Sequence, residues 1–179
     1  MSKQTRTRVH ERIAGQRFTS PFTDGAREVL TTAKSCALER GFKSWSPADV
    51  LVALSEASRW VPGTFLSDKL PGGVALRTKL PKKATAEAVP ETASRAGRGT
   101  KLFAKTLQSV HRRTGHDRVA TETLLLAVLS KPDRGVDRLL EGKRAELSQQ
   151  FQGLWLGTKK RKPKRARIRK LVSTRRARR

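Results

Sequence analysis

The chain has 179 residues, 36% of them hydrophobic, and a formal net charge of +25 at pH 7; this length suits one domain of about 130 residues with terminal extensions. The lone Cys36 excludes an internal disulfide and a cysteine-based structural zinc site, and no apolar run approaches the roughly 20 residues that span a bilayer. The polar N-terminus lacks the apolar core of a signal peptide, so we expect a cytoplasmic protein without a metal or cofactor.

Residues 1–21 are polar and basic, and we expect them to form a disordered arm. A first helix is predicted from about Thr23 to Arg40, with Thr23 or Asp24 as its cap and Gly41 ending it in a left-handed conformation. Its apolar positions form one stripe: Ala26, Val29, Leu30, Ala33, Ala37 and Leu38. Cys36 lies within this pattern, which favours core packing over a reactive thiol.

A second helix is predicted to follow Ser46, because Ser46 can cap it, Pro47 fits its first position and Asp49 can close a capping box. Its apolar residues are Val50, Leu51, Ala53 and Leu54. The rest of the first unit is predicted as breaks at Pro62-Gly63 and Pro71-Gly72-Gly73, a short helix with Phe65, Leu66 and Leu70, and a closing helix within Val74 to Leu80.

Residues 81–99 are rich in Ala, Thr, Gly, Lys and Glu and are predicted to be a linker. No stretch alternates with a period of two over a useful length, so we expect no substantial sheet. Four further helices are predicted near Thr100 to Thr114, Thr121 to Leu129, Arg134 to Leu140 and Lys143 to Leu154.

The sequence repeats itself at an interval of 74 residues. The segment from Gly41 to Leu54 (GFKSWSPADVLVAL) aligns with the segment that begins at Gly115 (GHDRVATETLLLAV). A helical unit that cannot bury its apolar face alone forms a core when it packs against a copy of itself. We therefore predict an all-α bundle of about eight helices in two pseudo-symmetric units, residues 22–80 and 100–156, with Leu51, Leu54, Leu125 and Val128 in the core.

The second copy resembles the N-terminal domain of the Clp ATPases. The family pattern is matched at Gly115-His116, Val119, Thr121-Glu122 and Leu124 to Leu126, and Thr123 replaces the second histidine of its Thr-Glu-His step. In the first copy, Phe22-Thr23 and the small residues Ala26, Ala33 and Ala37 match the preceding helix, so the resemblance covers about Phe22 to Trp155. It implies a double Clp-N repeat without the ATPase modules, since the glycines at Gly72-Gly73 and Gly97-Arg98-Gly99 lack the spacing of a phosphate-binding loop.

In Clp N-domains the Thr-Glu step begins a helix of each repeat, and in some members its acid recognises phosphorylated arginine on client proteins. The resemblance therefore implies a protein- or phosphoarginine-binding role for Thr121 and Glu122. Pro47 and Ala48 occupy the step in the first repeat, which lacks the acid. The alternative is that Glu122 only stabilises the positive N-terminus of its helix.

The histidines, His10, His111 and His116, have no Cys or carboxylate at metal-ligand spacing except Asp117, and nothing resembles a nucleophile elbow. We therefore predict no metal site, no catalytic residue and no enzymatic activity.

Residues 157–179 form a basic tail, which we expect to be disordered unless a polyanion neutralises it. The tail has no aromatic residue to stack on bases, so it is predicted to contact the phosphates of RNA or DNA and not their bases. A purely solubilising tail and contact with an acidic membrane surface are the alternatives. The predicted phosphate-binding residues are Lys159, Lys160, Arg161, Lys162, Lys164, Arg165, Arg167, Arg169, Lys170, Arg175, Arg176, Arg178 and Arg179.

Two functional hypotheses follow. In the first, a non-enzymatic Clp-N-like module binds a Clp-type chaperone, a client or an adaptor, and its basic tail anchors it to ribosomal RNA or to nucleoid DNA. In the second, the chain is an accessory or regulatory subunit of Clp-type proteolysis that recognises client or adaptor proteins, and nucleic-acid binding is incidental.

Overall fold

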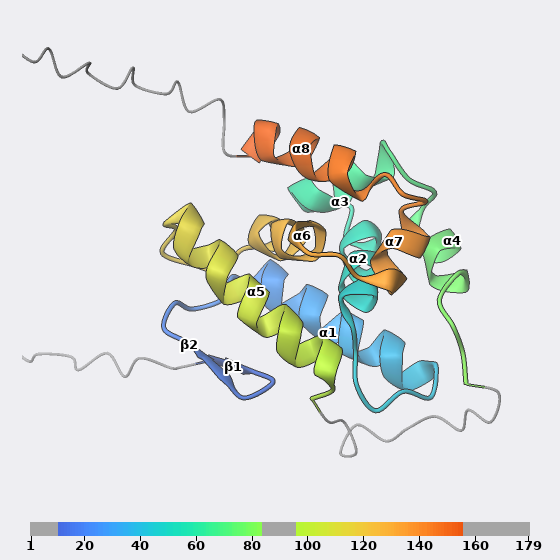
Figure 1. The fold of residues 1–179 in the computed structure, drawn as a ribbon, viewed down its shortest axis with the longest axis horizontal. Coiled ribbons are helices and arrows are strands. Elements are labelled where there is room, and N and C mark those ends of the chain that lie inside the picture. The colour runs from blue at the N-terminus through green and yellow to red at the C-terminus, as the bar shows by residue number, and fades with distance from the viewer. Residues whose placement is uncertain (1–10, 84–95, 156–179) are drawn as a thin grey trace, which may run out of the picture.

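The computed structural model describes residues 11–83 and 96–155, which form eight helices and one two-stranded antiparallel hairpin (Figure 1). In chain order the elements are β1 (Glu11–Ile13), β2 (Gln16–Phe18), α1 (Asp24–Glu39), α2 (Pro47–Glu56), α3 (Val61–Ser67), α4 (Gly73–Thr78), α5 (Arg98–Thr114), α6 (Thr121–Ser130), α7 (Arg134–Leu139) and α8 (Arg144–Trp155).

Helices α2 and α6 lie at the centre of the domain. All residues of α2 from Pro47 to Ser55, and all residues of α6 from Thr121 to Leu129, are buried, as is typical of helices that are apolar on every side. Helix α1 packs on α2, α5 packs on α6, and the two central helices contact each other. The predicted all-α fold in two helical units is confirmed.

The predicted core residues are buried. Leu51, Leu54 and Leu125 are inaccessible to solvent, and Val128 is almost so. Each contributes to one continuous apolar cluster that both units share. None of the described helices is both long and apolar enough to cross a membrane.

The predicted ends of α1 and α2 are also present. The backbone N–H of Ala26 donates to Thr23 Oγ1 at 3.2 Å, and Ser46 and Asp49 form a reciprocal capping box at the start of α2. After α1, Gly41 has φ = 80°, a left-handed conformation that a residue without Cβ adopts at low cost.

The N-terminal arm differs from the prediction. Residues 11–18 form a hairpin whose register places Arg12 opposite Arg17. Phe18 is buried and packs edge-on against Phe22, with ring centroids 5.1 Å apart. The predicted disordered arm is therefore wrong for residues 11–21, because burial of Phe18 and Phe22 fixes this segment on the bundle. Residues 1–10 lie outside the described residues.

Two boundaries within the bundle also differ. Pro62 lies in the first turn of α3 and does not break the chain there, because a proline in the first turn removes no helical hydrogen bond. Helix α5 starts at Arg98, inside the predicted linker of residues 81–99. Residues 84–95 of that linker lie outside the described part of the chain.

Candidate functional site

The Thr121–Glu122 step lies in the first turn of α6. Both residues are buried, Glu122 with 9% of its surface exposed. The hydroxyl of Thr121 donates to Glu122 Oε2 at 3.2 Å. Ala120, the residue that precedes the helix, supplies no side-chain cap, so the Glu122 carboxylate provides the negative charge at the positive end of α6. Among the described residues, no cation forms an ion pair with Glu122.

Main-chain hydrogen bonds hold this step against the beginning of the first unit. Phe22 and Val119 form a parallel bridge. Thr23 N donates to Val119 O at 3.0 Å, and Val119 N donates to Pro21 O at 2.9 Å. The Thr121–Glu122 step is therefore placed at a seam between the two units.

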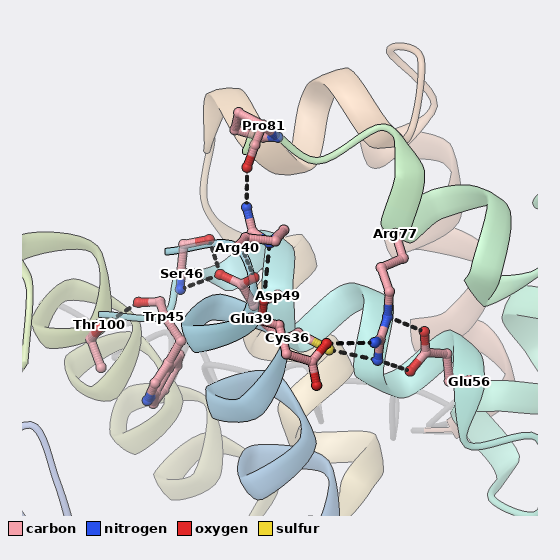
Figure 2. Close-up of polar contacts among 10 residues, drawn as sticks. All are labelled: Cys36, Glu39, Arg40, Trp45, Ser46, Asp49, Glu56, Arg77, Pro81 and Thr100. Carbon is pink, nitrogen blue, oxygen red and sulfur yellow. Dashed lines mark hydrogen bonds and ion pairs between the residues drawn. The ribbon is translucent and has the colours of Figure 1, made fainter. Parts of the chain in front are cut away.

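A matching contact joins the loop before α2 to the start of α5. Trp45, which lies 74 positions before Val119, accepts a hydrogen bond at its backbone oxygen from Thr100 Oγ1 (Figure 2). Its ring packs edge-on against Phe103, with centroids 5.6 Å apart. Gly97 lies so close to Ser44 that a Cβ would come within 2.5 Å of the Ser44 hydroxyl. Each unit thus rests its leading segment on the loop before the central helix of the other.

The first unit carries an internal ion pair near the position where the second has its free carboxylate. Ala48 is the residue of the first unit that aligns with Glu122. The next residue, Asp49, is buried and paired with Arg40 (Figure 2). Ser46 donates to Asp49 Oδ2 from its backbone nitrogen and its hydroxyl, both at 2.8 Å. Arg40 also donates to Pro81 O at 2.6 Å. Both carboxylate oxygens of Asp49 therefore already have partners within the domain and are not available to an external cation.

Arg77 organises a second polar cluster, between α1, α2 and α4 (Figure 2). Its guanidinium donates to both carboxylate oxygens of Glu56 at 2.9 Å and to Glu39 at 3.0 Å. It also lies 2.8 Å from Cys36 Sγ. Burial raises the pKa of the Cys36 thiol from 9.0 to about 11, against an opposite effect of Arg77. The thiol is therefore protonated at neutral pH, which agrees with its predicted place in the core.

A cleft of about 450 Å³ lies between the hairpin, α1 and the start of α5. Its wall combines aromatic rings, including Phe22 and Trp45, with cations, including Arg12 and Arg27. Arg27 is held by Glu11 at 2.6 Å, and Arg12 forms no ion pair with any described residue. This cleft was not predicted from the sequence, because residues 11–18 were expected to belong to a disordered arm. Thr121 and Glu122 do not line it.

The two histidines of the described chain lie near the C-terminal end of α5. His111 is buried, and its pKa is lowered first by desolvation and then by repulsion from His116. His116 packs its ring against Trp155, with centroids 5.8 Å apart. Within residues 11–83 and 96–155, no group of three His, Cys, Asp or Glu side chains is arranged to hold a metal ion.

The tail residues proposed to bind phosphates, from Lys159 to Arg179, lie outside the described residues, as does His10. Their role stays a prediction from sequence.

No family model matches the sequence, and no curated protein matches it. Solved structures do match. The N-terminal domain of the caseinolytic protease associated chaperone ClpD from Arabidopsis thaliana has a TM-score of 0.57 at 18% identity, over 76% of this chain and 95% of that one. The Hsp104 N-terminal domain from Candida albicans has a TM-score of 0.51 at 18% identity, over 75% and 91%. A chain from work on a malarial protein secretion system has a TM-score of 0.53 at 14% identity, over 75% and 97%. The fold is therefore that of a Clp or Hsp104 N-terminal domain, as the sequence resemblance implied.

Proposed function

We propose that this chain is a non-enzymatic protein-binding module, anchored to nucleic acid by its basic tail. The observation that carries the protein-binding part is the unpaired Glu122 carboxylate at the seam of a fold shared with chaperone N-terminal domains. ClpD is a caseinolytic protease associated chaperone, and the residues of this chain provide independent support for binding to a protein.

Glu122 differs from most other acids of the described chain. Glu11, Glu28, Glu39, Asp49, Glu56, Asp137 and Glu141 each pair with an arginine or lysine. The chain has a large excess of cations, yet the nearly buried Glu122 carboxylate has no ion-pair partner among the described residues. It is therefore available to the guanidinium group of a binding partner. Charge-assisted hydrogen bonds of this kind are about twice as strong as neutral ones. The neighbouring Thr121 hydroxyl adds a polar group that can contact a phosphoryl oxygen of a phosphoarginine side chain.

Only the second unit can offer this contact. In the first unit Ala48 removes the acid and Arg40 neutralises Asp49. We therefore propose one binding site per chain, at Thr121 and Glu122, where a symmetrical double repeat would have two.

The nucleic-acid part of the proposal rests on charge density. The segment from Lys159 to Arg179 has 13 Lys or Arg side chains and no acid. Cations at this density release counterions when they contact phosphates, which gives strong binding at low salt without base specificity.

Crosslinking in cells, followed by identification of the attached protein and nucleic acid, tests both parts. Two variants of the full chain accompany it: Glu122→Gln, and a tail in which every Lys and Arg from Lys159 onward is Gln. We expect Glu122→Gln to lose protein adducts while it keeps nucleic acid, and the tail variant to show the reverse.

If the Glu122→Gln variant still forms the protein adducts, the proposed role of Glu122 in binding a protein partner is wrong. Adducts that are confined to subunits of a Clp protease, with no nucleic acid, would instead establish the chain as an accessory subunit of proteolysis.

A further inference from the structure

We propose that the folded domain has a phosphate-binding face of its own, on α5 and the hairpin, which engages the backbone of duplex nucleic acid alongside the tail. This inference deepens the proposed function and rests on its nucleic-acid part. The face consists of six exposed cations: Arg12 and Arg17 on the hairpin, and Arg98, Lys101, Lys105 and Arg112 on α5.

Four of the five Lys and Arg side chains of α5, all except Arg113, form one row along the helix. Successive residues turn by about 100°, so the spacings from Arg98 to Lys101, Lys105 and Arg112 keep all four within a sector of roughly 60°. The row extends over about 21 Å, at 1.5 Å per residue. All four side chains are exposed, whereas Phe103, Ala104 and Leu107 on the opposite side are buried.

The hairpin extends this row sideways. Both of its strands contact α5, and Gln108 on α5 donates to the backbone oxygen of Arg17 at 3.3 Å. Arg12 and Arg17 are direct cross-strand partners, so their side chains leave the same face of the hairpin. Figure 1 shows the hairpin beside α5, with α8 at the far side of the domain.

The face contains no compensating acid. Residues 12–23 and 96–116 include no Asp or Glu, and Glu11 at the start of the hairpin is paired with Arg27. None of the six cations forms an ion pair with a described residue. Elsewhere in the described chain, cations such as Arg59, Arg77 and Arg144 are paired with carboxylates. The six cations of this face are therefore not neutralised by any described carboxylate.

This arrangement is unfavourable for the isolated domain. Lys101 and Lys105 repel each other at a spacing of four residues, and Arg12 and Arg17 repel each other across the hairpin. Arg98 and Lys101 also lie near the positive end of the α5 dipole, where the first turn has no acid. A bound polyanion relieves all three repulsions at once.

The chemistry of the face favours a phosphate backbone over other polyanions. The aromatic rings of these elements, Phe18 and Phe103, are buried, so no base can stack on them. Leu102 is the one large apolar side chain of α5 that is substantially exposed, which is too little to insert into a membrane. A row of cations about 21 Å long can follow the charged backbone of a duplex strand.

The test measures binding of the full chain to a 30-base-pair DNA duplex and to an RNA duplex of the same sequence, from about 50 to 300 mM salt. The test variant is Lys101→Gln/Lys105→Gln/Arg112→Gln. The control variant, Lys69→Gln/Arg138→Gln/Lys143→Gln, removes the same charge from exposed positions outside α5 and the hairpin. Thermal melts establish that both variants are folded.

We expect the test variant to reduce the magnitude of the slope of log affinity against log salt by about 2–3, and to weaken binding about 10- to 100-fold at 150 mM salt. The control should change the slope by less than about 1. A second variant, Arg12→Gln/Arg17→Gln, should lower the slope further by about 1–2. Equal losses for DNA and RNA indicate phosphate contact, and a loss for one duplex only identifies the nucleic acid that the face binds.

If test and control variants lose affinity equally, the face is overturned while the nucleic-acid part of the proposed function stands. If the tail variant binds as the wild type does but the test variant does not, the tail anchor fails and the face stands. Absence of duplex binding by the wild-type chain overturns both. Binding to phosphatidylserine vesicles, but not to duplexes, with the same loss in the test variant would assign the face to a membrane and overturn the inference.

Discussion

At the scale of single residues, Cys36 shows how burial controls reactivity. The thiol lies in the core beside Arg77 Nη2, and burial raises its pKa to about 11. Because the thiolate is the nucleophile, we expect iodoacetamide at pH 7.5 to modify the native protein far more slowly than the unfolded chain. Intact mass after timed quenching measures both rates. Similar rates in native and denaturing buffer would place the thiol at the surface.

The same pKa makes a statement about stability. The folded state holds the Cys36 proton more tightly than the unfolded chain, whose thiol has the ordinary pKa of 9.0. The stabilising contribution is full below pH 9 and is lost as pH rises through about 11, because the unfolded chain releases the proton first.

Glu122 is the residue on which the proposed binding step depends. We expect Glu122→Gln to weaken binding of phosphoarginine about 10- to 100-fold, which corresponds to loss of one charge-assisted hydrogen bond of about 1.5–3 kcal/mol. The stability of the domain should fall by only about 0.3–1 kcal/mol, the effect of a carboxylate at a helix N-terminus. Titration calorimetry gives the affinity.

The matched control is Glu146→Gln, which removes an exposed carboxylate from α8. No heat with wild-type protein would leave Glu122 with its other predicted role, that of a favourable charge in the first turn of α6.

At the scale of elements, the helices with local start and stop signals could be predicted. Thr23, Ser46 and Pro47 mark helix starts through contacts within a few residues, and Gly41 marks an end. Such contacts are written into the sequence next to the element they define. The pairing of Arg40 with Asp49 could not be predicted in this way, because it depends on how α1 and α2 cross.

The hairpin was missed for an equally physical reason. Its strands have three residues each, too few for a period of two to be recognised. Its turn uses Ala14 and Gly15, both with positive φ, where Asn-Gly or Asp-Gly would be the usual indication. The hairpin is held by the burial of Phe18 and by its contacts with α5, neither of which is visible in the local sequence.

Helix α6 provides the prediction for this scale. Leu125 is fully buried between the units, so Leu125→Ala should lower the free energy of unfolding by about 2–5 kcal/mol. Leu154→Ala on α8 is the control, because Leu154 is 71% exposed and its truncation should cost less than about 0.5 kcal/mol. Urea unfolding followed by circular dichroism measures both changes. Equal midpoints for the two variants would contradict the central position of α6.

At the scale of the whole molecule, the two units have kept one architecture and diverged in chemistry. Both place the leading segment of one unit against the loop of the other, through Phe22 with Val119 and through Thr100 with Trp45. Only the second unit retains a free acid at its central helix, while the first buries an ion pair there. The two units therefore share a fold but differ in charge: among the described residues, the unpaired acid lies on α6 of the second unit, and α5 and the hairpin carry six unpaired cations.

The basic tail is expected to supply most of the affinity of the whole chain for nucleic acid. Deletion of residues 159–179 should leave the melting temperature nearly unchanged, because that segment has no pattern that could contribute to the core. Binding to duplex nucleic acid should fall by orders of magnitude, and the salt slope should decrease by about 5–9 if the tail engages about 6–10 phosphates. Filter binding at several salt concentrations measures the slope. The remaining affinity should disappear when Lys101, Lys105 and Arg112 are also replaced by Gln, since the α5 face would supply it. If the truncated chain binds as tightly as the full chain at 150 mM salt, the tail is not the anchor, and the folded domain carries the whole nucleic-acid site.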